Sequence, residues 1–189
     1  MKPNDESRRH STALLIIDML NTFDFPEGKD LVRFTVPVAK KVKALKQKLK
    51  KKKVPVIYLN DNFGQWRSDS KEVYLNCAHE ASRGSEIAKI LKPDDDDYFI
   101  LKPRHSGFYC TNLDILLEDL GVKNLVLTGV AGNICVFFTA NDAHMRGFKI
   151  WVPKDCIASN TKKDNDFTLE QMSLVLGIKT AASTKAIPF

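Results

Sequence analysis

The sequence predicts an α/β fold, a three-layer sandwich in which a parallel sheet lies between two layers of helices. Five short apolar runs, rich in branched residues, recur along the 189 residues. None alternates cleanly between apolar and polar positions, and such continuous runs are typical of strands buried on both faces. Helical patterns separate the runs, and strands that alternate with helices form a parallel sheet through right-handed crossovers.

The expected strands are each bounded by polar or turn residues. They cover residues 13–18, 54–60, 98–102, 124–130 and 148–153, and a short sixth strand is expected near 177–182. The expected helices cover residues 34–53, 111–120, 133–146 and 164–176. The second of these helices begins with a threonine-asparagine cap and ends at Gly121, which are common signals for the two ends of a helix.

The composition predicts one folded domain over residues 11–189, preceded by a disordered lead-in at 1–10. The chain is 43% hydrophobic and 28% charged, as expected of a water-soluble globule. No apolar run approaches the ~20 residues that span a bilayer. The polar N-terminus lacks the apolar core of a signal peptide. We therefore expect a cytoplasmic protein with no membrane partner.

The net charge of +6 depends on one segment. Residues 40–53 contain nine lysines and no acidic residue, and without them the formal charge would be −3. Val42, Leu45 and Leu49 recur there at helical spacing, which indicates an amphipathic helix with a solvated basic face. A polyanion site is the alternative, but no aromatic or arginine residue interrupts the lysines. We expect no nucleic-acid partner.

The four cysteines show no metal-binding or disulfide pattern. Cys77, Cys110, Cys135 and Cys156 are separated by 33, 25 and 21 residues, without a CxxC pair. We expect unpaired thiols in a reducing compartment and no cofactor.

Reactive side chains follow three of the expected strands. Asp18 ends the first, Lys102 ends the third, and the fourth leads into Cys135 at the start of a helix. In open α/β sheets, ligands bind at the carboxyl ends of the strands, so these side chains are expected on one rim. Each also has an ordinary explanation, as a turn aspartate, an exposed lysine and a small buried thiol.

Together the three residues suit a hydrolase that uses a cysteine as its nucleophile. The thiolate would attack a carbonyl carbon, the aspartate would move protons, and backbone N–H groups would stabilise the oxyanion. The helix N-terminus and the lysine are expected to lower the pKa of Cys135.

Three separated motifs in order, "ALLIIDMLNTFDF", Lys102 with "SGF", and "TGVAGNICV…TANDA", resemble the isochorismatase-like cysteine hydrolases over about residues 13–177. The resemblance implies a six-stranded parallel sheet and an Asp18–Lys102–Cys135 triad. It further implies a cis peptide bond between Val130 and Ala131, an oxyanion hole formed by the N–H groups of Ala131 and Cys135, and a homo-oligomer.

The same resemblance bears on the substrate pocket and on metal binding. Phe23 matches a pocket-lining position, and Trp66 is a further pocket candidate for which burial under a loop is the alternative. Nicotinamidases of this group carry an Asp-x-His metal site. Here Asp61 could match the aspartate, but Phe63 replaces the histidine and His79 alone does not complete a site. We therefore expect no metal.

These observations leave three functions open. The first is a hydrolase that cleaves a small amide, ureido or related C–N bond through a thioester at Cys135. The second is an isochorismatase-type enol-ether hydrolase that uses Asp18 as an acid and does not rely on Cys135. The third is a non-catalytic binding protein on the same fold.

Overall fold

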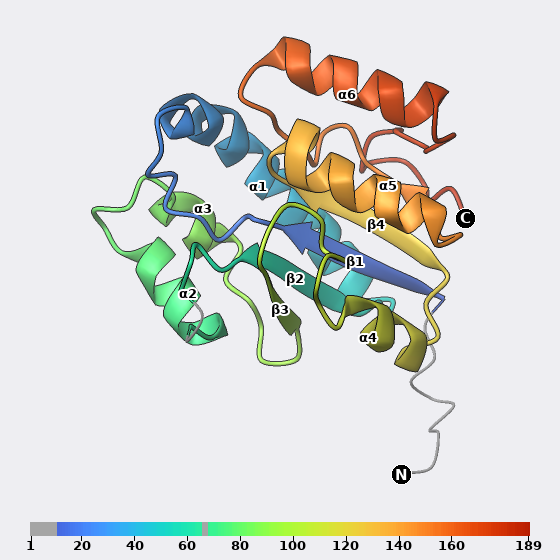
Figure 1. The fold of residues 1–189 in the computed structure, drawn as a ribbon, viewed down its shortest axis with the longest axis horizontal. Coiled ribbons are helices and arrows are strands. Elements are labelled where there is room, and N and C mark those ends of the chain that lie inside the picture. The colour runs from blue at the N-terminus through green and yellow to red at the C-terminus, as the bar shows by residue number, and fades with distance from the viewer. Residues whose placement is uncertain (1–10, 66–67) are drawn as a thin grey trace.

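A parallel sheet forms the centre of the molecule (Figure 1) in a computed structural model that describes residues 11–65 and 68–189. The sheet in these residues has five strands, in the order β3-β2-β1-β4-β5. The predicted lead-in at 1–10 lies outside the described residues. The strands are β1 (Thr12–Ile17), β2 (Val56–Asp61), β3 (Tyr98–Lys102), β4 (Asn124–Gly129) and β5 (Lys149–Trp151).

The central strand β1 pairs in parallel with both β2 and β4. Leu14 lies opposite Val56 on one side, and Ile17 lies opposite Gly129 on the other. The chain therefore first builds the sheet outward through β2 and β3, then returns to add β4 beside β1. Strand order reverses between β1 and β4, and a reversal of this kind leaves a crevice at the carboxyl ends of the strands.

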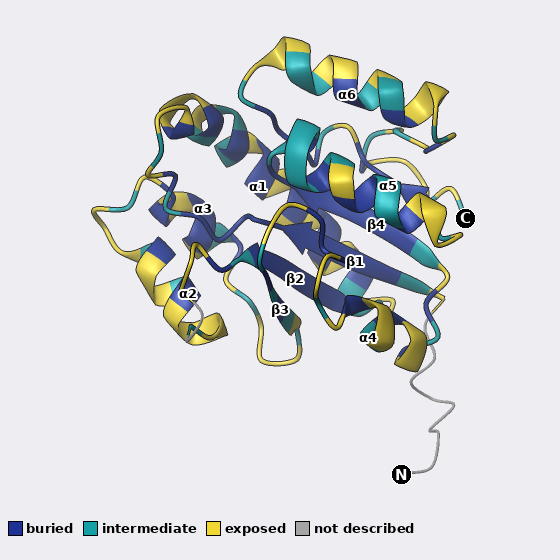
Figure 2. Ribbon diagram, viewed as in Figure 1, coloured by how far each residue is buried: buried dark blue, intermediate teal, exposed yellow. Residues whose placement is uncertain are grey.

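Helices cover both faces of the sheet, as the sequence predicts. They are α1 (Gly28–Lys50), α2 (Ser70–Ala78), α3 (Ser85–Ile90), α4 (Leu113–Asp119), the π-helical turn η2 (Gly132–Val136), α5 (Phe137–Met145) and α6 (Lys162–Leu174). Alternate residues of β1 face opposite layers. Leu14 and Ile16 pack with the layer of α1 to α3, whereas Leu15 and Ile17 pack with α4 to α6. Strands β1, β2 and β4 are buried almost throughout, whereas β3 at the edge of the sheet is only partly buried (Figure 2).

The expected sixth strand is wrong: within the described residues, the segment forms only an isolated bridge between Trp151 and Lys179. Val152 donates its N–H to the Lys179 carbonyl at 2.9 Å, but the register is then lost, because Lys154 reaches the Thr180 carbonyl at 3.4 Å. The Ala181 carbonyl, which would continue the ladder, accepts the indole N–H of Trp151 at 2.8 Å instead.

Two helices in the described residues, α2 and α3, were not predicted. Both are short, and neither carries a long amphipathic pattern. A capping signal marks the first of them, since the Asp69 side chain accepts the N–H of Glu72 at 2.8 Å. Helix α1 begins earlier than expected, at Gly28, and contains Pro37.

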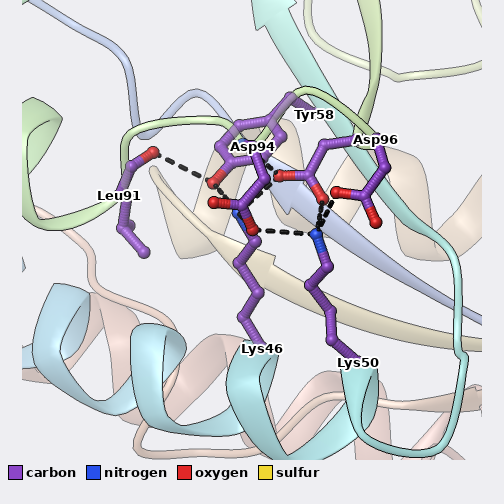
Figure 3. A network of polar contacts seen from close by, with 7 residues as sticks. Lys46, Lys50, Tyr58, Leu91, Asp94 and Asp96 are labelled. Carbon is purple, nitrogen blue, oxygen red and sulfur yellow. Dashed lines mark hydrogen bonds and ion pairs between the residues drawn. The ribbon is translucent and has the colours of Figure 1, made fainter.

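The basic helix is not solvated along its whole lysine face. Lys46 is only 5% exposed and pairs with Asp97, and its Nζ donates to the Tyr58 hydroxyl at 3.2 Å. Lys50 Nζ lies 2.8 Å from Asp94 and 2.5 Å from Asp96 (Figure 3). These contacts attach the end of α1 to the acidic turn before β3. The remaining lysines of the run are exposed, namely Lys40, Lys41, Lys43, Lys48, Lys51, Lys52 and Lys53.

Among the described residues, none of the helices combines the length and the apolar character that crossing a membrane requires.

Candidate active site

Neighbouring strand ends bring Asp18, Lys102 and Cys135 to one rim of the sheet. Asp18 follows β1 and Lys102 ends β3, while Cys135 lies in η2, which follows β4. Asp18 adopts a positive φ of 50°, which is uncommon for a residue with a Cβ. Its N–H donates to the Leu59 carbonyl at 2.8 Å, so β2 holds the backbone of this residue in place.

Lys102 joins the other two side chains. Its Nζ lies 2.8 Å from Asp18 Oδ2 and 3.6 Å from Cys135 Sγ. The lysine is fully buried and Asp18 is 4% exposed, whereas Cys135 is partly exposed. Of the three, the thiol is therefore the group that a ligand can reach most readily.

A second carboxylate, that of Asp61, belongs to this cluster. Asp61 lies opposite Lys102 in the β2–β3 register, and its Oδ2 is 3.7 Å from Lys102 Nζ. Its backbone N–H donates to Asp18 Oδ1 at 2.7 Å. The sequence singled out Asp61 only as a match to a metal ligand. A contact with Lys102 depends on strand register, which the apolar runs alone do not fix.

Burial dominates the electrostatics of the cluster. It raises the pKa of the Asp18 carboxyl, although the ammonium of Lys102 and hydrogen bonds to Cys135, Lys102 and the Asp61 N–H all oppose the shift. Burial by itself would lower the pKa of Lys102, but the charges of Asp18, Cys135 and Asp61 outweigh it, and the pKa is raised.

The expectation of an acidified thiol is wrong for the ligand-free site. Burial raises the pKa of Cys135 well above its ordinary value, and the negative charge of Asp18 raises it further. Lys102 acts in the opposite direction and does not compensate. At neutral pH the ligand-free site therefore holds a neutral thiol and an ammonium beside Asp18.

The backbone around Cys135 is unusual. The peptide bond between Val130 and Ala131 is cis, and η2 begins directly after it. The N–H of Gly132 donates to the Ala158 carbonyl at 2.7 Å, and the Ala131 carbonyl accepts from Ile134 at 3.0 Å. Within the part of the chain that the structure describes, the Ala131 N–H donates no hydrogen bond. It is thus available to an acceptor on a ligand.

A hydrogen-bonded chain links the segment after Lys102 to the helix after Cys135. The Gly107 N–H donates to Thr139 Oγ1 at 3.0 Å, and that hydroxyl donates to the Cys135 carbonyl at 2.7 Å. The rings of His105 and Phe138 also lie 5.4 Å apart. These contacts fix the loop that follows the lysine relative to the turn that carries the thiol.

Of the two predicted pocket residues, Phe23 is among those that the structure describes. Phe23 is fully buried in the core beside α1 and α3, with a positive φ of 55°. Its N–H donates to Asn21 Oδ1 at 2.7 Å, and its carbonyl accepts from Arg83 at 3.0 Å. Trp66 lies outside the described residues. That these residues line the substrate pocket stays a prediction.

The residues present do not fit a metal site of the Asp-x-His kind. Phe63 occupies the histidine position, Asp61 Oδ1 accepts the Phe63 N–H at 2.8 Å, and its other oxygen faces Lys102. His79 Nδ1 accepts the Ala81 N–H at 3.2 Å within its own turn. The described residues contain one acidic triplet, Asp94, Asp96 and Asp97, and each of its members is already paired with a lysine.

Comparisons with known proteins agree with this fold. Residues 12–184 match the isochorismatase domain family. An uncharacterised isochorismatase family protein of Bacillus subtilis is 46% identical over 164 residues, which are 87% of this chain and 90% of the relative. The ureidoacrylate amidohydrolase of Stutzerimonas stutzeri is 30% identical over 165 residues, which are 74% of this chain and 66% of the relative.

A solved structure has a similar fold. N-carbamoylsarcosine amidase from Thermoplasma acidophilum superposes with a TM-score of 0.65 and 28% identity, covering 94% of this chain and 99% of that one. The fold and the rim therefore define a hydrolase built on a parallel α/β sheet. The chain belongs to the isochorismatase family.

Proposed function

We propose that this protein cleaves a small amide, ureido or related C–N bond through a covalent thioester at Cys135. The observation that carries the proposal is the position of Lys102 Nζ, 2.8 Å from the Asp18 carboxylate and 3.6 Å from the Cys135 thiol. A base, a cation and a nucleophile thus meet at one buried point, as covalent catalysis of acyl transfer requires.

Acylation begins from the neutral thiol. Asp18 accepts the Sγ proton as the thiolate attacks the substrate carbonyl carbon, and the C=O electron pair moves to oxygen. The raised pKa of Asp18 makes it a stronger base than an ordinary carboxylate, which helps it to deprotonate a thiol whose pKa is also raised. Lys102 stabilises the negative charge at each stage.

Two backbone N–H groups, those of Ala131 and Cys135, are proposed to stabilise the oxyanion. The tetrahedral intermediate then collapses, the C–N bond breaks, and protonated Asp18 gives its proton to the departing nitrogen. The enzyme is left with a thioester at Cys135 and an ionised Asp18.

Water completes the cycle. Asp18 accepts a proton from water as its oxygen attacks the thioester carbon. The second tetrahedral intermediate expels the Cys135 thiolate, which recovers the proton from Asp18. The products are a carboxylic or carbamic acid and ammonia or an amine, and no external oxidant, reductant or metal takes part.

The amide and ureido substrate class is supported by two relatives, one named a ureidoacrylate amidohydrolase and the other an N-carbamoylsarcosine amidase. The substrate is proposed to be a small molecule, and the enzyme a homo-oligomer in the cytoplasm that needs no cofactor. Size-exclusion chromatography with light scattering measures the oligomeric state directly.

The test is a hydrolysis screen over small amides, ureido acids and carbamoyl compounds, with Cys135→Ala as the control. We expect turnover by the native enzyme and loss of at least about a thousandfold in Cys135→Ala, because the nucleophile is removed. Intact-mass spectrometry of the enzyme quenched during turnover should show the added mass of the acyl group on the Cys135 peptide.

The outcomes separate the candidate functions. Unchanged turnover in Cys135→Ala would reject the thioester route and favour the enol-ether reaction, in which Asp18 acts as the acid. Binding without any turnover, in both the native protein and the variant, would favour the non-catalytic protein.

A further inference from the structure

We propose that Asp61 is a substrate-binding residue that accepts a hydrogen bond from the N–H of the scissile nitrogen. It thereby selects amides and ureides that carry such an N–H over esters. This inference rests on the proposed function, because it assigns a role in the acylation step described above.

The starting point is the ammonium of Lys102. It has three N–H donors and three acidic neighbours, with Asp18 Oδ2 at 2.8 Å, Cys135 Sγ at 3.6 Å and Asp61 Oδ2 at 3.7 Å. The contact with Asp18 is a short charge-assisted hydrogen bond, whereas that with Asp61 lies beyond hydrogen-bond distance. Asp61 therefore receives electrostatic support from Lys102 without being fully engaged by it.

The two carboxylates of the site differ in exposure and in how many of their oxygens already accept hydrogen bonds. Asp18 already accepts from Lys102 and from the Asp61 N–H, and its side chain is only 6% exposed. The Asp61 side chain is 29% exposed. Its Oδ1 accepts the Phe63 N–H at 2.8 Å, but Oδ2 makes no hydrogen bond to any residue that the structure describes. One carboxylate oxygen beside Lys102, whose ammonium also contacts the thiol, thus keeps lone pairs for a ligand.

The charges around Asp61 Oδ2 indicate which kind of ligand group can bind there. Asp18, Asp61 and Lys102 together carry one net negative charge, so a second acceptor or an anion facing Asp61 Oδ2 would be repelled. A donor is required. The nitrogen of a primary amide or ureide carries two N–H groups, so one can face Asp61 while Asp18 later protonates the lone pair. An ester oxygen at the same place has no hydrogen to donate, and it would leave Asp61 without a partner.

The experiment compares 4-nitroacetanilide with 4-nitrophenyl acetate. Both give the same acetyl-enzyme and differ at the scissile atom, which is N–H in one and oxygen in the other. The ratio of their kcat/KM values therefore reports acylation at that atom and excludes the common deacylation step. We expect Asp61→Ala to lower kcat/KM for the anilide roughly ten- to hundredfold more than for the ester, the range of a hydrogen bond to a charged group.

A second variant and a matched control sharpen the test. Asp61→Asn keeps a carbonyl acceptor but loses the charge, so its ratio should lie between those of the native enzyme and Asp61→Ala. Asp95→Ala removes an exposed aspartate in the turn before β3, at the opposite end of that strand from Lys102, and should leave the ratio at its native value.

Equal losses on both substrates in Asp61→Ala would overturn the inference. That result would mean that Asp61 acts only through Lys102 or through folding. A native enzyme that hydrolyses the ester but shows no measurable turnover of any N–H substrate would overturn it too. Absence of Cys135-dependent turnover on either substrate would instead reject the proposed function, and with it the inference.

Discussion

The fully buried Lys102 supplies the positive charge of the site. Its Nζ lies 2.8 Å from Asp18 and 3.7 Å from Asp61, so without Lys102 these two carboxylates would lose the cation that both of them contact. The thiol beside it keeps its proton. The raised pKa of Cys135 is then no obstacle to catalysis, because the base that must take its proton lies in the same cluster.

The charges around Cys135 predict that Asp18→Asn changes hydrolysis and thiol reactivity in opposite directions. The variant should lose hydrolysis, because no base remains, yet Cys135 should react faster with iodoacetamide near neutral pH. Burial and the negative charge of Asp18 both raise the pKa of the thiol while Lys102 lowers it, so an uncharged asparagine removes one of the two raising effects and brings the pKa down. Peptide-resolved mass spectrometry of the alkylation rate against pH measures this directly.

Cys110 is the internal reference for that measurement. It is exposed in both proteins, so its labelling rate should not change, whereas Cys77 and Cys156 are buried and should label slowly. A Cys135 rate in Asp18→Asn that equals or falls below the native rate would contradict the assignment of Asp18 as the charge that keeps the thiol protonated.

At the scale of elements, the end of β4 decides where the thiol is placed. Gly129 has a φ of +118°, and a Cβ there would lie 2.0 Å from the Ile17 carbonyl oxygen. Its N–H donates to the Cys156 carbonyl at 2.9 Å. The close packing of this backbone against β1 therefore positions both the residue before Asp18 and the turn that leads to Cys135.

Gly129→Ala should accordingly destabilise the fold by more than about 2 kcal/mol and reduce activity, since it combines an unfavourable φ with a backbone clash. Gly147→Ala is the matched control. Its φ of +77° is also positive, but a Cβ there would meet nothing within 4 Å. It should cost only about 1 kcal/mol. Urea unfolding of both variants tests the difference, and equal costs would show that the clash relaxes away.

Elements also set the limit of what the sequence can predict. The five apolar runs locate the strands to within about two residues because continuous burial leaves a strong pattern, and the carboxyl-end rule then places Asp18, Lys102 and Cys135 together. The short helices α2 and α3 leave no such pattern. The sixth strand fails because a single side-chain contact, from Trp151 to Ala181, breaks the ladder, and a pattern of apolar residues does not reveal such a contact.

On the scale of the whole molecule, the site depends on four segments far apart in sequence. Asp18, Asp61, Lys102 and Cys135 come together only when β1, β2, β3 and β4 are in register. The sequence could not predict the contact of Asp61 with Lys102 or the rise in the thiol pKa, since both depend on distances and burial that exist only in the folded chain. The fold therefore creates electrostatic properties that its residues lack individually.

Burial of the Asp18 carboxyl should lower the free energy of unfolding when this group is ionised. The pKa of Asp18 is raised by burial, so the folded chain holds that proton more tightly than the unfolded chain does. Stability contributed by this group is therefore greatest below its ordinary pKa of 3.8 and falls as pH rises from that value through the raised one. If Asp18 is ionised at neutral pH, as the proposed proton transfer requires, its burial costs stability there.

Asp18→Asn should test this at the level of the whole molecule. The uncharged amide avoids the cost of burying the carboxylate, so the variant should melt at an equal or higher temperature than the native protein at pH 7 while lacking activity. Its advantage should shrink as pH falls through the raised pKa of Asp18 toward 3.8, because the native carboxyl is then protonated as well. Calorimetric melting of both proteins at several pH values measures the difference. A variant that is less stable at pH 7, with a deficit that disappears in acid, would mean that the ion pair with Lys102 outweighs burial and that this carboxylate stabilises the fold.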